Sequence, residues 1–80
     1  MTKIEYGKCE TLMNKAIDLV MWSKSAWEKS EESFNNGNKI DWEVQQRKSD
    51  QYYGEAIGIN QVLGMLNFKH EKMNMLADLL

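Results

Sequence analysis

A seven-residue repeat of large apolar side chains runs through the first half of the chain. Its members are Tyr6, Met13, Val20, Trp27 and Phe34. Smaller side chains stand three residues further on, at Cys9, Ala16, Ser23 and Ser30. Spacings of three and four residues place side chains on one face of an α-helix. The pattern therefore predicts a long helix with a narrow seam of alternating large and small residues.

The second half of the chain repeats this spacing of three and four residues. Its seam positions are Trp42, Gln45, Ser49, Tyr52, Ala56, Ile59, Leu63, Leu66, His70, Met73 and Ala77. A fold-back at Gly37 brings Trp27 opposite Ser49. It also brings Ile59 opposite Ala16, so that large side chains meet small ones. We therefore expect an all-α protein, a long antiparallel helical hairpin.

Local signals set the ends of the two helices. Thr2 followed by Glu5 forms a capping box, which predicts a helix start near residue 3. Gly37 can take the left-handed conformation that closes a helix, and Asp41 is the expected N-cap of the second helix. The 80 residues include no proline. We expect helices over about residues 3–35 and 41–79, a turn over 36–40, and a single domain over 1–80.

Nothing strongly terminates the second helix before the end of the sequence. Gly64 weakens it by about 1 kcal/mol relative to alanine, so a bend between Gly64 and Phe68 would fit the pattern. Because the second helix is the longer one, we expect residues 75–80 to project beyond the seam.

Many apolar residues remain outside the seam. Those that we assign to a partner-binding surface are Leu12, Leu19, Trp22, Ile57, Val62, Met65, Phe68, Met75, Leu76 and Leu79. A monomeric hairpin cannot cover so much apolar surface, and exposed apolar area of this extent normally marks an interface. We therefore expect self-association, with a symmetric dimer forming a four-helix bundle as the commonest solution.

Composition narrows the class of protein. The formal net charge is −2, which excludes the bulk positive charge of a protein that coats nucleic-acid phosphates. The single cysteine cannot form an internal disulfide, which favours a reducing compartment. The first residues lack a signal-peptide pattern, and no apolar run is long enough to span a membrane. We expect a soluble, cytoplasmic protein.

No metal or cofactor site is expected. His70 is the only histidine, and Cys9 is the only cysteine. Two such ligands do not make a zinc site. We interpret His70 as a seam residue near Tyr6, and Cys9 as a packed thiol.

The acidic residues do not form a catalytic site either. Glu28 and Glu31 resemble the first half of the ExxE…ExxD arrangement of MazG-like nucleotide pyrophosphohydrolases. The second half is missing, because Glu43 is followed three residues later by Gln46. We therefore expect a protein that is not an enzyme.

One small basic and aromatic group could bind an anionic ligand. Its members are Arg47, Lys48 and Tyr53, and surfaces of this kind stack bases and bind phosphates. Interleaved acidic residues such as Asp50 favour an ordinary salt-bridged face instead.

These observations favour an interaction protein that docks an apolar helical surface on another macromolecule, such as a host protein, and modulates or inhibits it. The composition, rich in Asn, Lys and Met on so short a chain, resembles that of small reading frames of AT-rich bacteria and their phages. For a chain of this size, we expect an inhibitor or adaptor of the kind that phages or mobile elements encode. Two alternatives stay open: an oligomeric sponge for a small anionic nucleotide, and a structural assembly subunit.

Overall fold

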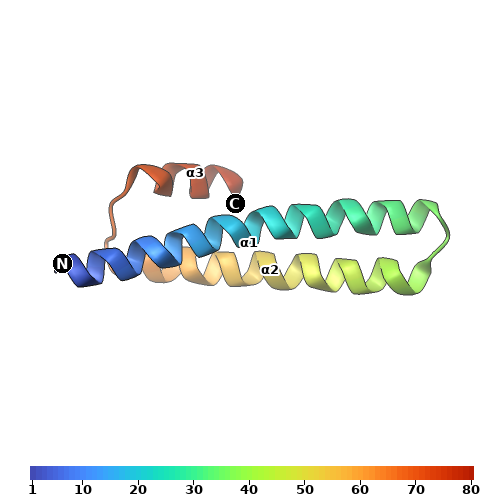
Figure 1. The fold of residues 1–80 in the computed structure, drawn as a ribbon, viewed down its shortest axis with the longest axis horizontal. Coiled ribbons are helices and arrows are strands. Elements are labelled where there is room, and N and C mark those ends of the chain that lie inside the picture. Colours follow the sequence, from blue (N-terminus) through green and yellow to red (C-terminus); the bar gives the residue numbers. More distant parts are fainter.

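The computed structural model describes all residues from 1 to 80 and contains three helices and no strands. Their bounds are α1 Lys3–Asn35, α2 Lys39–Met65 and α3 Glu71–Leu79. α1 and α2 run antiparallel side by side, and the short α3 returns beside the N-terminal half of α1 (Figure 1). The predicted all-α helical hairpin is therefore confirmed, in an elongated molecule of 52 × 17 × 16 Å.

The turn between α1 and α2 is built on Gly37, as predicted. Gly37 has a φ of 75°, a left-handed conformation that costs glycine little. Its N–H donates to the carbonyl of Phe34 at 3.1 Å, and the N–H of Asn38 donates to the carbonyl of Ser33 at 2.9 Å. This pair of bonds is a Schellman motif, which satisfies the last carbonyls of α1 and reverses the chain.

The N-caps of the two long helices differ in how well the sequence predicts them. The hydroxyl of Thr2 accepts from the N–H of Glu5 at 3.1 Å, as the capping pattern indicates. For α2, the predicted N-cap Asp41 is wrong. The side chain of Asn38 caps the helix by accepting from the N–H of Asp41 at 3.1 Å, so α2 begins at Lys39. Asp41 instead accepts from the hydroxyl of Ser33 and ties the two helices together at the turn.

The expected continuous helix over 41–79 is also wrong, because α2 ends at Met65. Asn67 has a φ of 58° and is the only residue other than glycine with a positive φ. Its N–H donates to the carbonyl of Gly64 at 3.0 Å, while the N–H of Phe68 donates to that of Leu63 at 3.0 Å. A second Schellman motif, with asparagine in the place of glycine, therefore stops the helix.

α3 lies on the hairpin instead of projecting beyond it, which corrects the expectation for residues 75–80. Nδ1 of His70 accepts from the N–H of Lys72 at 3.0 Å and caps the start of α3. Leu76 is completely buried. At the other end of α3, the hydroxyl of Tyr53 donates to the carbonyl of Leu80 at 2.6 Å. Contacts at both ends and in the middle thus fix the short helix in place.

The apolar core is concentrated in the half of the rod that α3 covers. Its cluster of ten buried residues comprises Cys9, Met13, Ala16, Ile17, Leu19, Val20, Ala56, Leu63, Phe68 and Leu76. Toward the turn, the buried positions hold only small side chains, such as Ala26 and Ser30. There the seam residues Trp27 and Phe34 are 48% and 66% exposed.

Where the seam passes from one half to the other, two serines join the helices. The hydroxyl of Ser23 donates to the carbonyl of Ser49 at 2.9 Å, and the hydroxyl of Ser49 donates to the carbonyl of Ser23 at 3.0 Å. Both residues are buried. The reciprocal bonds satisfy both hydroxyls and fix the register of α1 against α2.

Candidate interaction surface

The fold buries some of the residues predicted to bind a partner and leaves others exposed. Buried inside the chain are Leu19, Phe68 and Leu76. Half-buried are Ile57 and Leu79. Still exposed are Leu12, Trp22, Val62, Met65 and Met75. α3 packs Leu76 against the hairpin, so part of the apolar surface predicted to bind a partner is buried within the chain. The exposed apolar surface is therefore smaller than predicted.

The seam of α1 has two flanks, and α3 lies along only one of them. Seven-residue spacing puts Glu10 and Lys24 in one row of α1, and Leu12 and Ala26 in a row on the opposite flank. The first row faces α3, since Lys24 lines a hollow together with Leu79 and Glu10 hydrogen-bonds the residue that caps α3. The second row faces a groove that receives no residue from α3.

We call the groove along this second row of α1 the bare groove. It consists of two hollows along α1 and α2. The hollow nearer the turn, of about 380 Å³, is lined by Trp22, Ser25, Ala26, Lys29, Gln45, Lys48 and Tyr52. The other, of about 480 Å³, is lined by Leu12, Lys15, Glu55, Gly58, Ile59 and Val62.

An aromatic pair stands at the side of the bare groove. The rings of Trp22 and Tyr52 meet edge to face, with their centroids 5.8 Å apart and their planes at 65°. Trp22 is 52% exposed although it is the largest side chain of the groove. Large amphipathic rings that are fixed by a neighbour and open to solvent are typical anchors of protein interfaces.

The charges along the bare groove are mostly positive. Three lysines line it, Lys15, Lys29 and Lys48, against the single carboxylate of Glu55. None of these four side chains forms an ion pair, because the only one in the structure joins His70 and Glu10. A chain with a net charge of −2 therefore carries a local excess of positive charge around its exposed tryptophan.

The predicted anion-binding group is not brought together by the fold. Lys48 lines the bare groove, whereas Tyr53 lines the hollow beside Leu79 on the other flank. Arg47 is exposed and lines neither hollow. Adjacent residues of a helix point about 100° apart, so a cluster in sequence is not a cluster in space.

The sequence pattern did not indicate the residues that accompany Lys48 in the groove. Lys29 comes from α1 and Tyr52 from α2, and both lie beside Trp22. The heptad rows contained this signal, since Trp22 and Lys29 are seven residues apart and lie on one stripe of α1. The sequence alone did not show that this stripe lies beside Lys48 and Tyr52, because that depends on how α1 and α2 are aligned in the structure.

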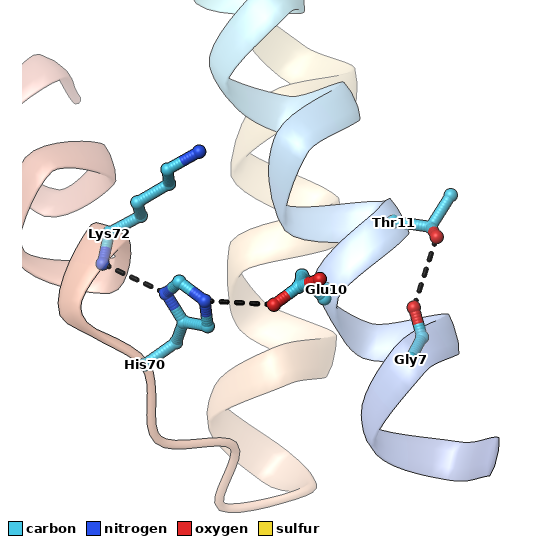
Figure 2. Close-up of polar contacts among 5 residues, drawn as sticks. All are labelled: Gly7, Glu10, Thr11, His70 and Lys72. Carbon is cyan, nitrogen blue, oxygen red and sulfur yellow. Dashed lines mark hydrogen bonds and ion pairs between the residues drawn. The ribbon is translucent and has the colours of Figure 1, made fainter. Parts of the chain in front are cut away.

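His70 has a structural place in the covered half. Figure 2 shows its ring between α3 and α1, with Nδ1 accepting from the N–H of Lys72 and Nε2 facing Glu10 at 3.0 Å. Because Nδ1 accepts, Nε2 carries the hydrogen that is donated to the carboxylate. The ring also lies 6.2 Å from that of Tyr6, as predicted, and stacks on Phe68 at 5.9 Å.

Cys9 is a buried free thiol, as predicted. No group of three or more His, Cys, Asp or Glu side chains is placed to hold a metal ion. None of the three helices combines the length and apolarity that a membrane span requires. Comparison of the chain with protein-family models, with curated proteins and with solved structures finds no match.

Proposed function

We propose that the chain is a small, non-catalytic helical interaction protein that binds another protein through the bare groove and modulates its activity. The observation that carries this proposal is the exposure of Trp22 and its apolar neighbours after α3 has closed the other flank. An exposed aromatic anchor on a rigid helical pair suits the capture of a partner surface. Inhibitors and adaptors encoded by phages or mobile elements are the class that we favour for a chain of this size.

Capture of a partner by a tagged chain tests this function. Trp22→Asp places a charge at the anchor and should abolish capture, while circular dichroism should show an unchanged helix content because the residue is exposed. The matched control is Ile40→Asp, since Ile40 is also apolar and is 79% exposed at the start of α2, away from the groove. Capture that survives Trp22→Asp, or that Ile40→Asp abolishes equally, would contradict the proposed surface.

A second candidate function is the binding of a small anionic ligand, such as a nucleotide. It is favoured by Lys29 and Lys48, which line the same hollow as the Trp22–Tyr52 pair. A nucleotide that binds there raises the unfolding midpoint, and Lys48→Ala should remove that rise. A screen of nucleotides that leaves the midpoint unchanged would rule out this candidate.

Self-association is a third use of the exposed apolar surface, either as a dimer or as a structural assembly subunit. Light scattering across a concentration series measures it directly. A mass that rises with concentration, and that Trp22→Asp returns to the monomer value, would assign the bare groove to contacts between copies of the chain.

A further inference from the structure

We infer that the bare groove binds an amphipathic α-helix of a partner protein whose flanks carry acidic side chains. This inference rests on the proposed function and adds the chemistry of the partner. It depends on three observations: the helix that lies on the opposite flank, the length of the groove, and the sign of the charges along it.

The opposite flank shows what kind of element this hairpin accepts. There α3, with nine residues, lies beside α1 and buries Leu76 completely. Met73 and Leu79 pack against the same core, so the contacts follow a spacing of three residues along α3. A helix with apolar side chains at such spacing therefore fits the flank of this seam, and the bare groove is the corresponding flank on the other side.

The bare groove is long enough for a helix longer than α3. Its lining residues on α1 extend from Leu12 to Lys29. At 1.5 Å per residue this is about 26 Å, or nearly five helical turns. Ile59 and Val62 supply apolar contacts at one end and the Trp22–Tyr52 pair at the other. Gly58 lies between them with no heavy atom within 4 Å of where a Cβ would stand, which leaves room for close approach.

The charges of the groove select the partner. Lys15 and Lys29 lie in one heptad row of α1, whereas the α2 edge carries Lys48 and Glu55, so the excess of positive charge lies on the α1 edge. None of the three has an acidic partner within the chain. Acidic side chains on a bound helix would face the ammonium groups of Lys15 and Lys29 along the α1 edge and that of Lys48 on the α2 edge. The net excess of positive charge favours the acidic helix over a basic one and speeds its association.

A second copy of the chain fits the groove less well. The only short helix that a copy could offer is α3, whose apolar face is already buried against its own hairpin. A two-fold contact between two bare grooves would bring the lysines of both copies together. The excess positive charge therefore disfavours the symmetric dimer through this surface.

Fluorescence anisotropy with synthetic peptides tests the inference on the full chain. The probe is a fluorescein-labelled, N-acetylated helix of about 17 residues with leucines at i, i+3, i+4 and i+7 and glutamates along both flanks. The comparison peptide has lysine in place of each glutamate. We expect the acidic peptide to bind about tenfold more tightly, and its affinity to fall as salt is added.

Charge reversal at the groove provides the matched controls. The double variant Lys29→Glu/Lys48→Glu should invert the preference, so that the basic peptide binds more tightly. Lys24→Glu changes the same residue type in the hollow beside Leu79, and should leave the preference unchanged. Equal affinities for the two peptides, or an unchanged preference in the double variant, would overturn the inference.

Failure of this inference and failure of the proposed function give different results. If the double variant still captures the natural partner while Trp22→Asp does not, the groove is the interface but the acidic helix is wrong. If sedimentation equilibrium shows a dimer that strengthens with salt and is lost in Trp22→Asp, a second copy occupies the groove and the inference is overturned.

Discussion

Asn67 determines where the hairpin ends and α3 begins. Non-glycine residues rarely adopt the left-handed conformation, which costs most of them about 1–2 kcal/mol, and asparagine is among those that tolerate it. Asn67 adopts it at the C-terminus of α2 with a φ of 58°. Three glycines, Gly54, Gly58 and Gly64, precede Asn67 and weaken a helix more than asparagine does, yet all three lie inside α2. The residue that ends α2 was therefore visible in the sequence, but asparagine indicates a helix end less specifically than glycine does.

Replacing Asn67 should change stability according to how well the new residue tolerates a positive φ. Asn67→Val should lower the free energy of unfolding by about 1–2 kcal/mol, because a β-branched residue is strained in this conformation. Asn67→Gly should leave the stability unchanged or raise it slightly, because glycine adopts the conformation freely. Urea unfolding followed by circular dichroism measures both. Equal losses in the two variants would indicate that the side-chain amide, and not the backbone conformation, is what matters.

His70 combines two contacts that substitution can separate. His70→Ala removes both the cap of α3 and the bond to Glu10, and should cost about 1–2 kcal/mol. His70→Asn keeps a capping oxygen but cannot reach Glu10, so it should recover most of the loss. The Glu10 side chain is 46% exposed, which makes its contact the weaker of the two. Urea unfolding of the two variants and of Glu10→Gln measures how much the cap and the Glu10 contact each contribute to the free energy of unfolding. If Glu10→Gln lowers this free energy as much as His70→Ala does, the Glu10 contact is not the weaker of the two.

At the level of the elements, the two long helices were predictable because their signals are local and repetitive. Heptad spacing, the Thr2 cap and the Gly37 turn each act within a few residues. The return of α3 depends on contacts far apart in sequence, such as that of Tyr53 with Leu80 and that of His70 with Glu10. Because the sequence did not indicate that α3 folds back, the buried residue Leu76 was assigned to a partner surface.

Leu76 gives the clearest test of whether α3 contributes to the fold. Leu76→Ala removes a completely buried side chain and should cost about 2–4 kcal/mol. Met75→Ala is the matched control on the same helix, because Met75 is 47% exposed and should cost less than about 1 kcal/mol. Chemical unfolding measures the difference. Similar small losses in both variants would mean that α3 does not dock on the hairpin in solution.

At the scale of the whole molecule, stabilising contacts are unevenly distributed along a rod. The radius of gyration is 15.2 Å, whereas a compact chain of this length would have one of about 12 Å. Met13, Val20 and Leu63 are buried in the half that α3 covers. In the half next to the turn, the seam is closed by alanine and serine, and large side chains such as Trp27 lie at the surface. The bare groove extends over both halves, so a bound helix would contact the weaker half as well as the stronger one.

Amide hydrogen exchange should reveal this difference directly. Regions with few buried apolar contacts open at lower free energy than the core, so amides near Ser30 in α1 and Gln46 in α2 should exchange faster than those near Ala16 and Ala56. The sites are matched for secondary structure, since each lies within one of the two long helices away from its ends. Uniform protection along both helices would mean that the hairpin opens as one unit. Binding of the acidic peptide should slow exchange most at the turn half, because the occupied groove supplies there the apolar contacts that α3 supplies to the other half.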